Sequence, residues 1–90
     1  MNNAAPKRTT KLMLVYELHA PIGVFQISPE LQGRWRLDMN GVALNRYRSA
    51  ESAASAVELR LTGLDAWDSS EAFIKPQRLG EWERRYVAAV

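Results

Sequence analysis

The fold of this chain is decided by the stretch Arg34-Trp35-Arg36-Leu37-Asp38-Met39-Asn40-Gly41-Val42-Ala43-Leu44-Asn45-Arg46-Tyr47-Arg48. Asn40-Gly41 lies at its centre, between two runs that contain apolar residues. Asn-Gly in this setting is the strongest short-range signal for a β-hairpin, because a type I′ turn needs positive φ at both central residues. The pattern therefore predicts two antiparallel strands joined by a two-residue turn.

A two-residue turn also fixes which residues of the two strands pair. The expected pairs are Met39 with Val42, Leu37 with Leu44, and Trp35 with Arg46. Most side chains of these pairs are apolar and share one face, whereas the other face is polar, as a sheet with one buried side requires. This register places Trp35 and Tyr47 on opposite faces, so they are not expected to form one platform for stacked bases.

The hairpin leads directly into the strongest helical pattern of the chain. Ser49 is a good N-cap residue, and the helix is predicted from Ala50 to about Thr62. Gly63 is placed to adopt the left-handed conformation that follows a helix end. Arg60 is expected to point to solvent. The positions that line the buried side at helical spacing are Ala50, Ala53, Ala54, Val57 and Leu61.

The segments before the hairpin add further strands. Residues 11–19 are apolar on both alternations until Glu17, which is typical of a strand covered on both faces. Residues 20–23 form a turn signal, and residues 24–27 are a short strand candidate. Residues 1–10 are polar and show no periodic apolar face, so they are predicted to be a disordered arm before a single domain of residues 11–90.

The C-terminal region allows two interpretations. Leu79, Trp82, Tyr86 and Ala89 recur at helical spacing and favour a short helix. The alternation of Trp82, Arg84 and Tyr86 leaves a terminal strand open as the second possibility. Residues 64–71 are expected to form a loop whose only large apolar anchor is Trp67. At least two of the three tryptophans are expected in the core, because a small domain needs large residues to fill its interior.

These patterns together predict the α+β class. We expect an antiparallel sheet of three to four strands, with one main helix packed on one face. A short C-terminal helix would close the core through Leu79 and Trp82.

The composition limits the class of protein further. Ninety residues predict one domain, and 47% hydrophobic with 24% charged residues are ordinary globular values. The chain has no cysteine, which excludes disulfides, thiol nucleophiles and cysteine-ligated zinc. That composition fits a reducing compartment, so we expect a cytoplasmic protein. No apolar run reaches the ~18 residues of a membrane span, and neither a signal peptide nor membrane association is expected.

The residues do not combine into a catalytic or metal-binding motif. His19 is the only histidine and lies in a mostly apolar strand, without a partner that would make it a general base. Asp65, Asp68 and Glu71 lie close in sequence but lack the spacing and the glycine of a calcium loop. Asp68 with Glu71 instead has the spacing of a helix cap. We therefore expect no enzyme activity, no cofactor and no metal.

A resemblance covers roughly the second half of the chain. It rests on Tyr47-Arg48-Ser49-Ala50-Glu51-Ser52-Ala53-Ala54, Val57, Thr62-Gly63, Trp67-Asp68, Pro76, Leu79 and Trp82. This pattern resembles an uncharacterised family of short bacterial hypothetical proteins, in which a Tyr-x-Ser-x-Glu-x-Ala-Ala run precedes Thr-Gly and Trp-Asp. The resemblance implies no function.

A looser likeness is to GYF-type peptide-binding modules, and it concerns architecture only. Those modules join a Trp-containing strand, a glycine turn, an aromatic residue and a helix that starts at a serine. The positions here that follow this order are Trp35, Asp38, Gly41, Tyr47 and Ser49. Asn45-Arg46 stands where the Gly-Pro of those modules precedes the aromatic residue, so the signature of proline recognition is missing.

Two functional hypotheses remain. Residues 1–48 carry seven Lys and Arg against three Asp and Glu, and such a half attracts polyanions or favours head-to-tail self-association. The first hypothesis is a small non-enzymatic protein-interaction domain, with an unknown protein or a second copy as partner. The alternative is a nucleic-acid-binding domain that uses the basic hairpin. The candidate contact residues are Arg34, Arg36, Tyr47 and Arg48.

These candidate residues also have a purely structural interpretation. The arginines would then flank core aromatic residues on a solvated sheet face. Arg34 would lie over Tyr47 as a cross-strand cation–π pair.

Overall fold

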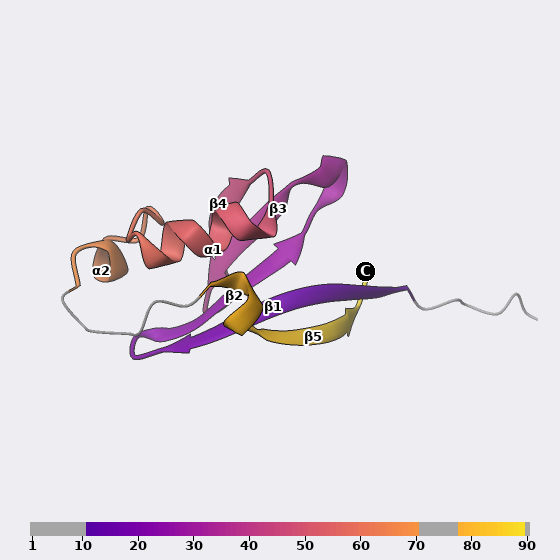
Figure 1. The fold of residues 1–90 in the computed structure, drawn as a ribbon, viewed down its shortest axis with the longest axis horizontal. Coiled ribbons are helices and arrows are strands. Elements are labelled where there is room, and N and C mark those ends of the chain that lie inside the picture. Colours follow the sequence, from indigo (N-terminus) through magenta and orange to yellow (C-terminus); the bar gives the residue numbers. More distant parts are fainter. Residues whose placement is uncertain (1–10, 71–77, 90) are drawn as a thin grey trace, which may run out of the picture.

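The computed structural model describes residues 11–70 and 78–89, and it forms one five-stranded antiparallel sheet with a helix on one face (Figure 1). The order of the strands in the sheet is β4-β3-β2-β1-β5. In chain order the elements are β1 (Leu12–Ala20), β2 (Gly23–Pro29), the 3-10 turn η1 (Leu31–Gly33), β3 (Trp35–Met39), β4 (Val42–Tyr47), α1 (Ala50–Glu58), α2 (Asp65–Asp68), the 3-10 turn η2 (Leu79–Glu81) and β5 (Glu83–Ala88). The predicted disordered arm, residues 1–10, lies outside the described residues. Within these ranges, no helix has both the length and the apolar character that a membrane crossing requires.

The α+β class is confirmed, but the predicted number of strands is too low. The additional strand is β5, where a short C-terminal helix was expected. Residues 79–81 form only one 3-10 turn, and the chain then pairs with β1 from Glu17↔Glu83 to Leu12↔Ala88. The alternation that begins at Trp82 therefore describes this region better than the helical spacing, because β1 offers it a long edge to pair with.

The hydrophobic core lies between α1 and the sheet. In Figure 1, α1 lies along the same face of β2, β3 and β4. Its buried residues are Ala50, Ala53, Ala54, Ala56 and Val57, so its buried side consists of small residues that allow a close approach to the strands. Trp67 and Trp82 are buried and Trp35 is half-buried, which confirms that at least two tryptophans belong to the core.

The hairpin turn forms at Asn40-Gly41 as predicted. Both residues have positive φ, 51° and 83°, as a type I′ turn needs. The Asn40 side chain also reaches the neighbouring turn between β1 and β2, where its Oδ1 accepts a hydrogen bond from the Val24 amide at 2.9 Å. Gly23 makes this contact possible, because a Cβ at that position would collide with the Asn40 carboxamide.

The predicted register is correct next to the turn and wrong beyond it. Met39 pairs with Val42, but Leu37 pairs with Asn45 and not with Leu44, because β4 contains one extra residue in a β-bulge. Trp35 consequently pairs with Tyr47 rather than with Arg46, and both aromatic side chains share the face that α1 covers. The bulge therefore turns Tyr47 toward the core.

The helix α1 ends four residues earlier than predicted. The amide of Arg60 donates to the carbonyl of Val57 and that of Leu61 to the carbonyl of Ala56, which is the hydrogen-bond pattern of a Schellman motif. Arg60 therefore takes the left-handed position, with φ of 59°, in place of Gly63. Leu61, expected on the buried side, is 67% exposed.

A contact with Trp67 accounts for the unfavourable left-handed arginine. The guanidinium of Arg60 lies 4.1 Å from the centre of the Trp67 ring and donates to the Trp67 carbonyl at 2.9 Å. These contacts offset the roughly 1–2 kcal/mol that a side chain loses in the left-handed region. The expectation that Arg60 points to solvent is therefore wrong. The predicted cation–π pair of Arg34 with Tyr47 is also wrong, because Tyr47 pairs with Trp35 and shares its face of the sheet, opposite to that of Arg34.

Asp68 stabilises the connection between α1 and α2. Its Oδ1 accepts hydrogen bonds from the amide and the hydroxyl of Thr62, and its Oδ2 accepts one from the amide of Gly63. Burial by itself raises the pKa of Asp68, but these bonds and the charge of Arg60 outweigh it and lower the pKa below its ordinary value of 3.8. The predicted capping pair with Glu71 lies partly outside the described residues.

This lowered pKa predicts acid-sensitive stability. A carboxylate with a lowered pKa in the folded state stabilises the fold above its unfolded pKa, and the contribution is lost as pH falls through the folded pKa. We expect Asp68→Asn to reduce the free energy of unfolding by about 2 kcal/mol at pH 7. The gap to the wild-type protein should narrow below about pH 4. Urea unfolding from pH 7 to pH 2 measures this difference, and a gap that stays constant with pH would contradict it.

Candidate functional site

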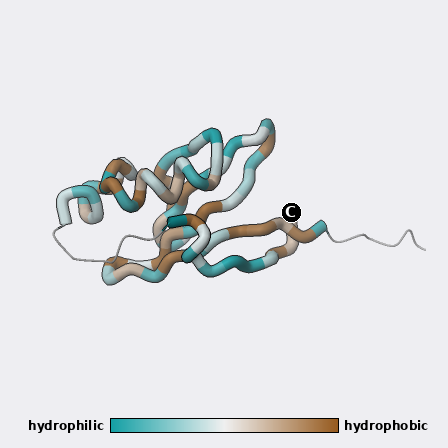
Figure 2. Tube along the Cα trace, in the orientation of Figure 1, coloured by the Kyte–Doolittle hydropathy of each residue, from teal (hydrophilic) through white to brown (hydrophobic). Residues whose placement is uncertain are grey.

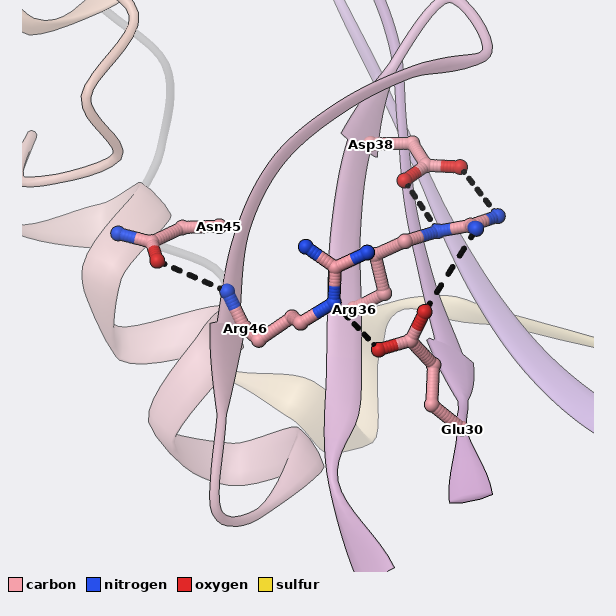
Figure 3. A network of polar contacts seen from close by, with 5 residues as sticks. All are labelled: Glu30, Arg36, Asp38, Asn45 and Arg46. Carbon is pink, nitrogen blue, oxygen red and sulfur yellow. Dashed lines mark hydrogen bonds and ion pairs between the residues drawn. The ribbon is translucent and has the colours of Figure 1, made fainter. Parts of the chain in front are cut away.

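The sheet face opposite α1 carries a network of charged side chains centred on Glu30 (Figure 3). Arg36 binds Asp38 through two contacts, at 2.8 Å from Nε and 3.0 Å from Nη2, and also lies 3.7 Å from Glu30. Glu30 also forms an ion pair with Arg46, in which the Arg46 Nε lies 2.7 Å from the Glu30 Oε1. Asp38 is buried in this network, so its charge needs Arg36 as a partner. Arg36, a predicted contact residue, is therefore committed to Asp38 and Glu30.

The other three predicted contact residues come together in a second place. Arg34, Tyr47 and Arg48 line a cavity of about 560 Å³ between residues 32–34, the end of β4 and the first turn of α1. We call it the arginine pocket, and its lining residues are Gln32, Gly33, Arg34, Arg46, Tyr47, Arg48 and Ser52. The structure thus assembles three of the four candidates and adds Arg46, which the bulge in β4 brings across from Arg36.

The charges of the arginine pocket are only partly balanced. Arg46 is paired with Glu30, whereas no ion pair within residues 11–70 and 78–89 involves Arg34 or Arg48. Both of these side chains belong to exposed residues. The pocket therefore presents two positive charges that are available to an anion.

Tyr47 lines this pocket, but its ring is not fully exposed. It is half-buried, and burial raises the pKa of its phenol, as does the charge of Asp68. Its hydroxyl is buried and has no hydrogen-bond partner in the described part of the chain. Trp35, now on the same face, is half-buried beside Tyr16, with ring centres 6.2 Å apart. Trp35 and Tyr47 therefore form no stacking platform for bases. The predicted reason was that they lie on opposite faces, whereas in the structure both lie on the face that α1 covers.

A groove next to the arginine pocket arises where β1 and β2 separate. The β1–β2 ladder runs from Ala20↔Gly23 only as far as Tyr16↔Ile27, although β1 continues to Leu12. Figure 1 shows the two strands diverging toward the right of the view, where β1 is accompanied by β5 alone. The first half of β1 is therefore an edge strand on this side.

The backbone direction in this half of β1 follows from one hydrogen bond. The amide of Ala89 donates to the carbonyl of Lys11 at 2.8 Å, so Lys11 directs its polar groups toward β5. Because direction alternates along an antiparallel strand, Met13 also faces β5, while Leu12 and Leu14 direct their N–H and C=O groups toward the gap. No strand of the described chain pairs with them there.

Pro29 explains why β2 does not cover this edge. Continuing the observed register would place Pro29 opposite Leu14, at a position where β2 would have to donate a hydrogen bond. Proline has no N–H group, so the ladder cannot be extended there. The chain then leaves the sheet through η1.

The groove itself has a volume of about 830 Å³ and is mainly apolar. Its lining residues are Lys11, Leu12, Met13, Leu14, Pro29, Glu30, Leu31, Gln32, Arg34, Arg46 and Ala89, and we call this set the edge groove. Leu12 is 66% exposed and Leu31 89% exposed, so both present apolar surface to solvent. Figure 2 shows the first half of β1 as hydrophobic, next to a largely hydrophilic β5.

Sequence reasoning missed the edge groove. Its local signals were Pro29 at the end of a predicted strand and Leu31 two residues later. The missing pairing itself depends on the divergence of β1 and β2, which no local sequence pattern describes. The remaining chemical candidates are accounted for structurally. His19 is exposed near the end of β1, and Asp68 uses both oxygens for Thr62 and Gly63. No cluster of three potential metal ligands occurs within residues 11–70 and 78–89.

Comparisons of the chain with protein-family models, curated proteins and solved structures find no match. The resemblance to short bacterial proteins and the likeness to GYF-type modules therefore stay predictions.

Proposed function

We propose that this chain is a non-enzymatic protein-interaction domain that binds an extended peptide segment as an added strand along β1. The observation that carries the proposal is the edge of β1 with which none of the described strands pairs, where Leu12 and Leu14 direct backbone donors and acceptors into an apolar groove. A peptide that adds a strand to a sheet edge gains backbone hydrogen bonds from the edge and specificity from pockets for alternate side chains.

The size of this edge predicts weak binding. Two residues offer four backbone hydrogen bonds, each worth about 1 kcal/mol net. Burial of apolar surface on Leu12 and Leu31 adds about 1.5 kcal/mol for each side chain. These contributions add to about 7 kcal/mol, which corresponds to a dissociation constant on the order of 10 µM before the cost of association is subtracted, so we expect binding weaker than this.

The structure offers less support for the alternative, nucleic-acid binding. Arg34 and Arg48 remain available to phosphates, but Arg36 is neutralised by Asp38 and Glu30. Trp35 and Tyr47 pack against α1 and do not expose ring faces for bases. A second copy of this chain is the other alternative partner, and the peptide experiment below includes a measurement of oligomeric state.

The proposal is tested by selecting from a displayed library of random heptapeptides and titrating an enriched synthetic peptide into the labelled protein. We expect the largest amide shifts at Leu12, Leu14 and the 29–34 segment. Leu31→Gln should weaken binding about tenfold, because it removes apolar contact worth about 1.4 kcal/mol. Leu61→Gln is the matched control, since Leu61 is similarly exposed but lies outside the edge groove.

Several outcomes would contradict the proposal. Failure of the selection to enrich any sequence is one, and equal binding by the Leu31 and Leu61 variants is another. Concentration-dependent mass in solution, with shifts at the same groove amides in the absence of peptide, would identify a second copy as the partner.

A further inference from the structure

The arginine pocket and the edge groove adjoin each other. They share Gln32, Arg34 and Arg46 as lining residues, so a strand that occupies the groove passes the mouth of the pocket. The side chain of such a strand that points toward Arg34 would enter the pocket. The charge of the pocket then decides which side chains fit.

The positive charge of the arginine pocket is complementary to a group with two negative charges. The pocket holds three guanidinium groups, of which Arg46 is paired with Glu30, while Arg34 and Arg48 take part in no ion pair with the described residues. A phosphorylated side chain carries about −1.5 to −2 charges at pH 7 and three acceptor oxygens. Guanidinium groups bind phosphate oxygens with two parallel hydrogen bonds, which lysine cannot do.

The start of α1 adds further donors of the right kind. Ser52 lies in the first turn of α1 and lines the pocket. Its amide donates to the Oγ of Ser49, and that hydroxyl in turn donates to the Oγ of Ser52. The Ser52 hydroxyl proton is therefore left for another acceptor. The positive end of the helix contributes a favourable potential for an anion near these arginines.

We infer that the arginine pocket binds a phosphoryl group on a side chain of the peptide that occupies the edge groove. The inference rests on the proposed peptide-binding function and names the chemistry of the partner: an extended segment with apolar residues and one phosphorylated serine, threonine or tyrosine. The backbone and apolar side chains bind along β1, and the phosphoryl group is held by Arg34 and Arg48 with Ser52 as a further donor.

The arrangement of the arginines favours this partner over a nucleic acid. Polyanion binding along a strand of phosphates uses a stripe of basic residues with exposed aromatic faces between them. Here the available arginines converge on one cavity, and the apolar groove next to it suits a peptide better than a sugar-phosphate chain. A single phosphoryl group fits the two available charges.

The experiment compares three forms of one library-selected peptide that differ at a single position. Serine, glutamate and phosphoserine are placed in turn at each position, and binding is measured by calorimetry and amide shifts. At one position we expect phosphoserine to bind about 30-fold more tightly than serine, because it adds charge-assisted hydrogen bonds from two arginines. Glutamate should recover only a small part of this gain. Raising the salt concentration should reduce the gain.

Matched variants locate the effect in the pocket. Arg34→Gln and Arg48→Gln should each remove most of the phosphoserine gain. Arg48→Gln, which lies outside the edge groove, should leave the affinity for the serine peptide within about twofold. Arg84→Gln is the control, since it removes the same charge from an exposed residue of β5 outside the pocket and should keep the full gain. Amide spectra of each variant establish that the fold is retained.

The outcomes separate the inference from the function on which it rests. If the serine peptide binds in the groove and phosphoserine brings no gain at any position, the inference is wrong and the proposed function stands. If no form of the peptide binds, both fail. A single-stranded 12-mer oligonucleotide that shifts Arg34 and Arg48 and binds more tightly than the phosphopeptide would overturn the inference in favour of nucleic-acid binding.

Discussion

Replacing Trp67 by alanine is expected to lower the free energy of unfolding by about 4 kcal/mol, the largest effect of any single substitution considered. Trp67 is 1% exposed and packs edge-to-face on Phe25, with ring centres 5.1 Å apart. Its indole Nε1 donates to the carbonyl of Val57 at 2.9 Å, which also accepts a hydrogen bond from the Arg60 amide. Its outer face supports the Arg60 guanidinium.

The loss would therefore combine a cavity, the loss of one buried hydrogen bond, and a left-handed Arg60 that no longer contacts the indole ring. Urea denaturation followed by circular dichroism measures it. Because a domain of this size has about 5–15 kcal/mol of stability in total, the alanine variant is close to unfolding. Trp67→Phe gives a second measurement, since it keeps the ring contact with Phe25 and loses the Val57 hydrogen bond. We expect a cost of about 1–2 kcal/mol for phenylalanine.

A cost below about 1.5 kcal/mol for Trp67→Ala would mean that Trp67 is not the anchor that holds the 59–68 connection against the sheet. In that case the left-handed Arg60 would need another explanation. The two substitutions together distinguish loss of volume from loss of the hydrogen bond.

Proline at two adjacent positions of β1 is expected to have opposite consequences for stability and binding. Met13→Pro should cost about 3 kcal/mol or more, because the Met13 amide faces β5 and belongs to the ladder. Leu12→Pro should cost less than about 1 kcal/mol, since its amide faces the edge groove and no strand of the described chain accepts from it.

Peptide affinity should respond differently. Leu12→Pro removes one of the four donors and acceptors offered to an added strand, and we expect binding to weaken about fivefold, in line with about 1 kcal/mol per hydrogen bond. Thermal unfolding and peptide titration of both variants test these expectations. Equal destabilisation by the two prolines would refute the assigned backbone direction, and unchanged peptide affinity of Leu12→Pro would refute strand addition at this edge.

The features that the sequence predicted correctly depend on residues close together in the chain. Asn40-Gly41 specifies its turn because both residues adopt positive φ readily, and Ser49 caps α1 through its own side chain, with Oγ accepting from the Ser52 amide. The α+β class follows from such local preferences. The candidate residues Arg34, Tyr47 and Arg48 could be named from their types and position beside the hairpin.

The wrong predictions involve partners far apart in sequence. The bulge in β4 exchanges Arg46 for Tyr47 opposite Trp35, and this register brings Tyr47 under α1 and Arg46 to Glu30. The end of α1 at Arg60 depends on Trp67, and the strand β5 depends on the long edge of β1. Periodicity within one segment does not contain this information.

The stretch from Arg34 to Arg48 by itself determined the hairpin, its turn and the entry into α1, because these depend on backbone preferences of neighbouring residues. Only the tertiary structure decided which of its arginines are available, since Arg36 is neutralised by Asp38 and Glu30 while Arg34 and Arg48 converge on a pocket. It likewise decided that β2 leaves the edge of β1 at Leu12 and Leu14 unpaired within the described residues. The physical reason is that charge pairing and strand pairing depend on distances between segments, and those distances exist only in the folded chain.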